Sequence, residues 1–204
     1  MDSTDRIAQR TYRYWYDDGL VELVGAALFA LLALFFYLQA VAPQGPVAGF
    51  SALLLPILVI AGTLGARRIV RAAKERFTYP RTGFVSYRQP SRARRGWSAA
   101  LAALLGALIA AWVLRSGVSF NLLLLVQGGI FAVGFALPGW RFGLRRFLGL
   151  AALAVLAGTF VSRTDWGMER SDAAFFGALA LGLLVSGGLT LWSYLRHTQP
   201  PAEA

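Results

Sequence analysis

The chain alternates between long apolar blocks and short polar segments. A helix needs about 20 apolar residues to cross the hydrocarbon core of a bilayer. Open strands leave backbone groups unpaired in lipid, so each apolar block is predicted to be a helix. The predicted fold class is therefore all-α and integral to a membrane: a bundle of six transmembrane helices with a structured, basic cytoplasmic loop. The six blocks are residues 20–42, 47–66, 97–114, 122–138, 147–161 and 173–195.

Short connections group these blocks into three helical hairpins. The polar segments between and beside the hairpins complete the expected organisation, with an amphipathic stretch at the N-terminus, a basic loop at 67–96, a short basic loop at 139–146 and a polar tail. The fifth block is the shortest, and flanking arginines can snorkel to help it span. The predicted parts are residues 1–19, 20–66, 67–96, 97–138, 139–146, 147–195 and 196–204.

The first block has a second interpretation. Residues 40–42 read Ala-Val-Ala, which resembles the cleavage site of a signal peptide. However, the apolar region exceeds the usual length of such peptides, and the preceding segment is rich in Asp, so we expect a retained span.

The distribution of basic residues predicts the orientation. If the six blocks all cross, 17 of the 20 Lys and Arg residues fall on one side. Positive charge near membrane spans marks the cytoplasmic side. We therefore expect a multi-pass protein of the cell inner (plasma) membrane with both termini in the cytoplasm. The six Trp residues lie near predicted span ends, where indole rings favour the headgroup region.

Composition agrees with a membrane protein and excludes several kinds of chemistry. The chain is 57% hydrophobic and 15% charged, with no Cys and one His. Soluble domains average about 45–50% apolar and 25% charged. The absence of Cys excludes disulfides and thiolate chemistry. One His makes a metal site improbable, so no metal and no cofactor are expected.

Three acids lie where the chain enters the first span: Asp17, Asp18 and Glu22. Asp18 and Glu22 are four residues apart and would share a helix face. They could simply suit the positive end of a helix. They could instead pair with arginines of the 67–96 loop and clamp it to the membrane face, or form a cation or substrate site. All three interpretations stay open at this point.

The 67–96 loop carries half of the basic residues. Its start continues the helical pattern of the second block to about residue 77. A turn is predicted at Tyr79, Pro80, Arg81 and Gly83, because Pro80 stops a helix and Gly83 permits positive φ. We include this turn with the acids in a possible cytoplasmic interface. Basic groups beside a membrane also attract anionic headgroups. The candidate lipid contacts are Arg67, Arg68, Arg71, Lys74 and Arg76.

Few polar residues lie inside the blocks, and Gln127 is the most prominent. It could bond a neighbouring helix or mark an intramembrane polar site. No catalytic residues can be assembled from the pattern. No nucleic-acid recognition module is visible, so the expected partners are membrane lipids and possibly other membrane proteins, with the oligomeric state undetermined.

Two segments carry a resemblance. YWYDDGLVEL at 14–23 and ERFTYPRTGFVSY at 75–87 resemble small polytopic bacterial membrane proteins with a cytoplasmic Tyr-Pro-Arg-Thr-Gly segment. The resemblance implies a bacterial multi-span protein and brings no catalytic residues.

The expected function is a non-enzymatic scaffold, regulator or subunit of a membrane complex. The alternative is a small permease with a pathway near Pro56 and Gln127. An intramembrane enzyme is the third possibility, since a lipid-modifying site built on the three acids and on arginine side chains is conceivable.

Overall fold

A computed structural model describes residues 16–77, 115–117 and 119–198 of the chain. The predicted third span at 97–114 and the turn formed by Tyr79, Pro80, Arg81 and Gly83 lie outside the described residues. Within those residues the regular secondary structure is entirely helical, apart from turns and bends. The helices are α2 (Leu20–Val41), α3 (Pro46–Gly49), α4 (Ser51–Phe77), α7 (Phe120–Arg141), α8 (Arg145–Val161) and α9 (Met168–His197).

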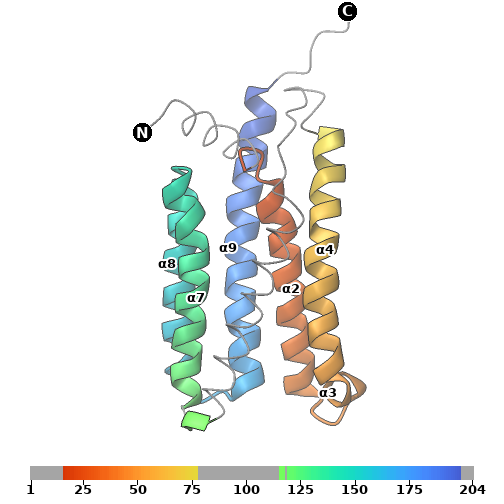
Figure 1. Ribbon diagram of the computed structural model, residues 1–204, viewed down its shortest axis with the longest axis vertical. Coiled ribbons are helices and arrows are strands. Elements are labelled where there is room, and N and C mark those ends of the chain that lie inside the picture. Colours follow the sequence, from red (N-terminus) through yellow and green to blue (C-terminus); the bar gives the residue numbers. More distant parts are fainter. Residues whose placement is uncertain (1–15, 78–114, 118, 199–204) are drawn as a thin grey trace, which may run out of the picture.

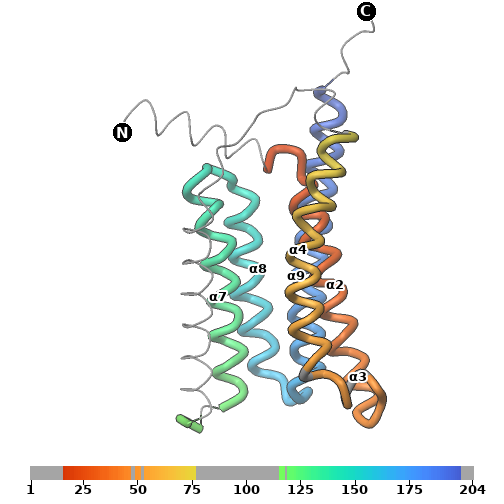
Figure 2. The backbone as a smooth tube through the Cα atoms, turned by 45° about the vertical axis from the view of Figure 1, so that its right-hand side comes forward, coloured from red at the N-terminus to blue at the C-terminus, as the bar shows by residue number. Residues whose placement is uncertain are grey.

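The long helices run roughly along one axis (Figure 1). Each packs on the next in the order α4, α2, α9, α8 and α7. Figure 2 shows α7 beside α8, with α2, α4 and α9 grouped on the other side. The start of α2, the end of α4, the α7–α8 turn and the end of α9 all lie at one end of the bundle. We call this end the basic end, because Lys74, Arg76, Arg141, Arg145, Arg146 and Arg196 belong to these segments.

The all-helical class predicted from the apolar blocks is confirmed. The described residues contain fewer membrane-length helices than the six that were predicted. Four described helices are long and apolar enough to cross a membrane: α2, α4 from Leu53, α7 and α9. The fifth block forms α8, which has 17 residues and falls short of that length. At 1.5 Å per residue α8 measures roughly 26 Å, slightly less than the hydrocarbon thickness of about 30 Å.

Phenylalanines from three helices fill the core. Phe29 of α2, Phe131 of α7 and Phe176 of α9 meet with ring centroids 5.4–5.8 Å apart. Leu32, Leu124, Ala154 and Leu179 are buried around them. Aromatic pairs at this separation add to the packing energy of the area they bury. This cluster brings α7 into contact with the α2–α9 pair, so the helices form a bundle rather than a single row.

Small residues let two helices approach closely. A Cβ added at Gly128 of α7 would lie 2.9 Å from the Ala154 oxygen and 3.0 Å from the Gly158 Cα of α8. Lipid gives no hydrophobic drive between helices, so close backbone approach is a main source of association. Ala154, Gly158 and Ser162, spaced four residues apart on α8 and at its C-terminal end, are buried. Among the described helices, α7 packs mainly on α8, across the boundary between two predicted hairpins.

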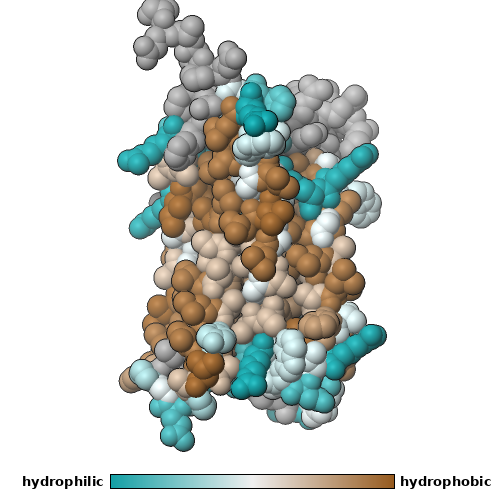
Figure 3. Space-filling model, turned by 180° about the vertical axis from the view of Figure 1, so that it is seen from behind, coloured by the Kyte–Doolittle hydropathy of each residue, from teal (hydrophilic) through white to brown (hydrophobic). Residues whose placement is uncertain are grey.

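The outer surface of the helices is apolar. Figure 3 shows hydrophobic side chains over the middle of one face and hydrophilic ones gathered at its two ends. Leu53, Ile57, Ile60 and Leu64 of α4 are among the most exposed apolar side chains. A soluble monomer rarely exposes such continuous apolar surface. This apolar surface is suited to contact with the acyl chains of a lipid bilayer.

Candidate functional site: a buried charge network at the basic end

A tight turn at 16–19 leads the chain into α2. Gly19 has φ +71°, which L side chains rarely adopt. A Cβ there would lie 2.4 Å from the Gly187 oxygen of α9. The Leu20 N–H donates to Asp18 Oδ1 at 3.2 Å. The glycine therefore lets the first turn of α2 press against α9, and Asp18 satisfies one of the unpaired N–H groups of that turn.

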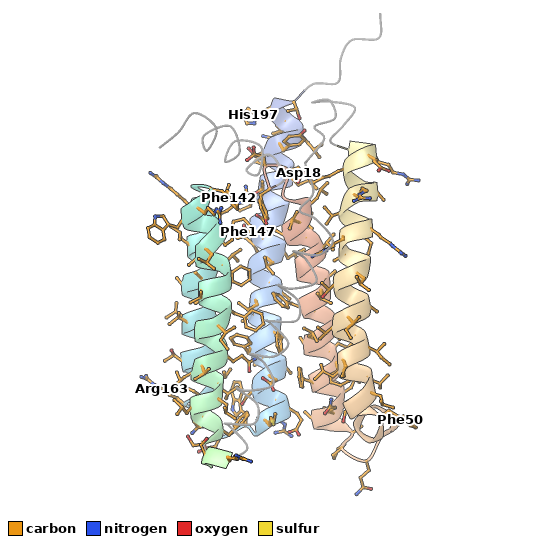
Figure 4. The ribbon with its side chains drawn as sticks, viewed as in Figure 1. Asp18, Phe50, Phe142, Phe147, Arg163 and His197 are labelled. Carbon is orange, nitrogen blue, oxygen red and sulfur yellow. The ribbon has the colours of Figure 1, made fainter. Side chains whose placement is uncertain are left out.

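Asp18 forms an ion pair with Lys74 of α4. The Lys74 Nζ donates to Asp18 Oδ2, and each side chain is only 1% exposed. Figure 4 places Asp18 near the basic end, level with the upper turns of α4. Two buried charges are tolerated when each neutralises the other. This contact ties the entry of α2 to the last turns of α4.

Glu22 lies one turn further along α2 and pairs with Arg146 of α8. The Arg146 Nε donates to Glu22 Oε1 at 2.7 Å. Its Nη1 donates to Thr190 Oγ1 of α9 at 3.1 Å, and its Nη2 donates to the Tyr16 carbonyl. One guanidinium thus joins α2, α8, α9 and the entry turn. Glu22 Oε2 is buried and has no hydrogen-bond partner among the described residues.

The Tyr16 ring covers this network. It stacks on Phe142 at 6.0 Å and meets Phe147 edge-on at 5.4 Å between ring centroids. Burial, with a further contribution from the Glu22 carboxylate, raises the pKa of the Tyr16 phenol above its usual 10.0. The phenol therefore stays neutral at physiological pH, and its ring packs on Phe142 and on Phe147 beside the arginine.

An open polar cleft of about 470 Å³ lies against Arg146 at the end of α9. Its wall includes Asp17, Thr190, Ser193 and His197. We call it the polar cleft. The three predicted acids therefore occupy different places: Asp18 and Glu22 are buried in ion pairs, and half-buried Asp17 borders the polar cleft.

The predicted lipid contacts on α4 fall into two groups in the structure, exposed arginines and one buried lysine. Arg67, Arg68 and Arg71 are exposed and line a shallow cleft of about 220 Å³ together with Glu75. Arg76 is also exposed. The prediction for Lys74 is corrected, because its ion pair with Asp18 buries it away from any headgroup. One of the three interpretations of the acids paired them with arginines of 67–96, most of which lie outside the described residues. Among the described residues, Asp18 meets a lysine of this segment and Glu22 meets an arginine from outside it.

Gln127 lies away from the charge network, in the half of α7 remote from the basic end. Its Nε2 donates to Asp172 Oδ1 of α9 at 3.1 Å. Asp172 is buried, and so is the neighbouring Ser171, whose Oγ has no hydrogen-bond partner among the described residues. Pro56 is exposed on α4, so the structure does not bring it together with Gln127.

The sequence interpretation gave no buried polar partner to three residues. Arg146 counted as a flanking arginine of the fifth block, Asp172 lay just before the block at 173–195, and Lys74 was expected to contact lipid. A usable signal existed for Arg146, because an Arg at the first turn of an apolar helix is close enough to the core to need an acid. No pattern in the sequence indicates which acid it meets.

The fold and the distribution of apolar side chains define an all-helical membrane protein with a buried ion-pair network near one end. Among the described residues, no group of three His, Cys, Asp or Glu side chains is placed to hold a metal ion. No protein-family model, curated protein or solved structure matches the chain. Its function must be argued from its own residues.

Proposed function

We propose that the chain is a non-enzymatic integral membrane protein that works as a scaffold, regulator or subunit of a membrane complex. The supporting observation is that two ion pairs, Asp18–Lys74 and Glu22–Arg146, join α2, α4 and α8, and that Arg146 also bonds Thr190 of α9. A catalytic acid must reach its substrate. Asp18 and Glu22 are buried, so they act as structural groups that fix the basic end.

We further infer six spans in the inner (plasma) membrane, with both termini in the cytoplasm. The basic end carries most of the described basic residues, whereas Arg115 and Arg163 belong to segments at the opposite end and Arg170 to the first turn of α9 there. Positive charge favours the cytoplasmic side. The end of α4 and the start of α7 lie at opposite ends of the bundle (Figure 1), and a further crossing at the predicted span 97–114 would connect them. Fluorescent-reporter fusions after residues 77, 142 and 198 should be bright, and a fusion after residue 165 should be dark.

Co-purification tests the scaffold role. The tagged full chain, solubilised from native membranes in mild detergent, should carry a stoichiometric protein partner detectable by mass spectrometry. The exposed arginines of α4 are the natural contact, so Arg68→Gln with Arg71→Gln should weaken recovery of that partner. Arg163→Gln with Arg170→Gln removes the same charge at the opposite end and is the matched control. Recovery of the chain alone from native membranes would contradict this proposal.

A small permease is the second candidate, and Asp172 is the observation that favours it. A buried carboxylate in a membrane-length helix often marks an ion pathway. Asp172 is such a carboxylate, held by Gln127 of another helix. Proteoliposomes loaded with a pH-sensitive dye would report proton flux. A permease should lose flux in Asp172→Asn while its thermal stability is unchanged. A structural role for the pair predicts no flux in either protein.

A further inference from the structure

The polar cleft continues into an apolar groove between α8 and α9. The groove has a volume of about 620 Å³ and is lined by Gly149 and Leu153 of α8 and by Gly182 and Val185 of α9. Arg146 belongs to both hollows. We call the second one the apolar groove. Because Arg146 lines both, we treat the two hollows as one depression that this residue divides.

The same face of α9 runs through both hollows. Gly182, Ser186, Leu189, Ser193 and His197 recur every three or four residues, which places them along one side of the helix. Toward the middle of the bundle this side is apolar, and toward the basic end it carries hydroxyl groups. The lining of the depression thus changes from apolar to polar toward the basic end. A bilayer changes in the same direction, from acyl chains to headgroups.

Exposed tryptophans show where the membrane surface lies relative to Arg146. Trp140 at the end of α7 is 86% exposed, and Trp192 on α9, two residues from the arginine's partner Thr190, is 55% exposed. Indole rings at such positions favour the headgroup region. Arg146 therefore lies at headgroup depth, with the apolar groove below it in the hydrocarbon.

Arg146 retains hydrogen-bonding capacity. A guanidinium has five N–H donors. Nε is used by Glu22, one donor of Nη1 by Thr190 and one of Nη2 by Tyr16. One N–H on each terminal nitrogen is left without a partner among the described residues. Phosphate oxygens suit paired donors of this kind. Ser186 Oγ, in the wall of the apolar groove, is also buried with no partner among the described residues.

We propose that this depression binds one phospholipid from the bilayer. The phosphate accepts hydrogen bonds from Arg146 and from nearby hydroxyls of the polar cleft, and one acyl chain lies in the apolar groove between α8 and α9. The bound lipid completes the α8–α9 contact, which protein side chains leave partly open. The inference requires only that the chain lies in a membrane, so it stands or falls separately from the scaffold role.

Native mass spectrometry of the purified full chain tests the acyl-chain contact. The chain is delipidated in mild detergent and titrated with palmitoyl-oleoyl phosphatidylglycerol. Gly149→Leu should fill the apolar groove, because a Cβ at Gly149 meets nothing within 4 Å. We expect one tightly bound lipid for the wild type and binding at least tenfold weaker for Gly149→Leu. Gly134→Leu, on α7 and equally unobstructed, is the matched control and should bind as the wild type does.

The phosphate contact is tested separately. Glu22→Gln with Arg146→Gln removes both charges and so leaves no unpaired ion in the protein. This double variant should bind the lipid about tenfold more weakly, since a hydrogen bond to a charged group is typically worth that factor. Palmitoyl-oleoyl glycerol, which has the same chains and no phosphate, should bind the wild type as weakly. Equal binding of the two lipids, or equal binding by Gly149→Leu and Gly134→Leu, would overturn the proposal.

Discussion

The Arg146 Nε donates to Glu22 Oε1 at 2.7 Å, although 124 residues separate the two side chains in the sequence. Glu22 is almost fully buried and Arg146 is one-quarter exposed. With the pair of Asp18 and Lys74, this contact joins the segments that enter and leave the membrane at the basic end. The stability of that end should therefore depend on charge pairing more than on apolar burial.

Breaking the Glu22–Arg146 pair should be costly. Arg146→Gln leaves the Glu22 carboxylate buried without its cation, and losing one partner of a buried pair costs about 3–5 kcal/mol. Thermal unfolding in detergent should show a clear loss of stability. Arg145→Gln removes the neighbouring exposed charge and should change little. Adding Glu22→Gln to Arg146→Gln should recover most of the loss. Equal stability of Arg145→Gln and Arg146→Gln would show that the pair contributes nothing.

Lys74 gives a second test on another helix. Lys74→Met should destabilise the protein by a similar amount, about 3–5 kcal/mol, because Asp18 would stay buried and charged. The double variant with Asp18→Asn should be close to the wild type, since the Asn oxygen can still accept from the Leu20 N–H. Arg71→Met, an exposed position on the same helix, is the control. The idea fails if the Lys74 and Arg71 substitutions have the same effect on the melting temperature.

Substitutions at two adjacent glycines of α7 distinguish the effect of helix packing on stability from the effect of helix propensity. Gly128→Leu would push a side chain into the backbone of α8, and overpacking of this kind costs about 1–3 kcal/mol or more. Gly129→Leu meets nothing within 4 Å and should be neutral or stabilising, because Gly is a poor helix former. The comparison is made by thermal unfolding of both variants in the same detergent. A loss of stability that is equal at the two positions would contradict the close α7–α8 contact.

The entry turn can be tested with two glycines of similar backbone geometry. Gly19 has φ +71° and Gly143 has φ +68°. Alanine should cost about 1–2 kcal/mol at either position from backbone strain alone. Gly19→Ala should cost more, because its Cβ would also meet the Gly187 oxygen, whereas Gly143 has open space. Denaturation of the two variants gives the difference. If Gly143→Ala proves as damaging as Gly19→Ala, the contact with α9 is unimportant.

Helix positions were largely predictable from the apolar blocks. The block at 20–42 became α2 (Leu20–Val41), and the polar continuation after residue 66 became the end of α4 at Phe77. The prediction succeeded because a chain in lipid has to satisfy its backbone groups within each segment. The predicted helix ends were the least accurate. For example, α9 begins at Met168, whereas the predicted block begins at residue 173, because the first turn of the helix is charged and was not counted as apolar.

Partners were not predictable from the blocks. Asp17, Asp18 and Glu22 were treated as one cluster. In the structure Asp18 and Glu22 form separate ion pairs, and Asp17 borders the polar cleft. Gln127 was expected to bond a neighbouring helix or to mark a polar site, and its partner Asp172 lies one residue before the predicted block at 173–195. These outcomes depend on which helices are neighbours and on how each is rotated about its axis.

The sequence by itself determined that the chain is helical, that it suits a membrane and that its basic residues are unevenly distributed. These properties follow from composition along the chain, because each helix satisfies its own backbone. The tertiary structure alone decided that Glu22 meets Arg146, that Asp18 meets Lys74 and that α7 lies on α8 through Gly128 and Gly158. Lipid does not select helix neighbours by hydrophobicity. Close glycine contacts and buried polar pairs select them, and both become visible only when the helices are assembled.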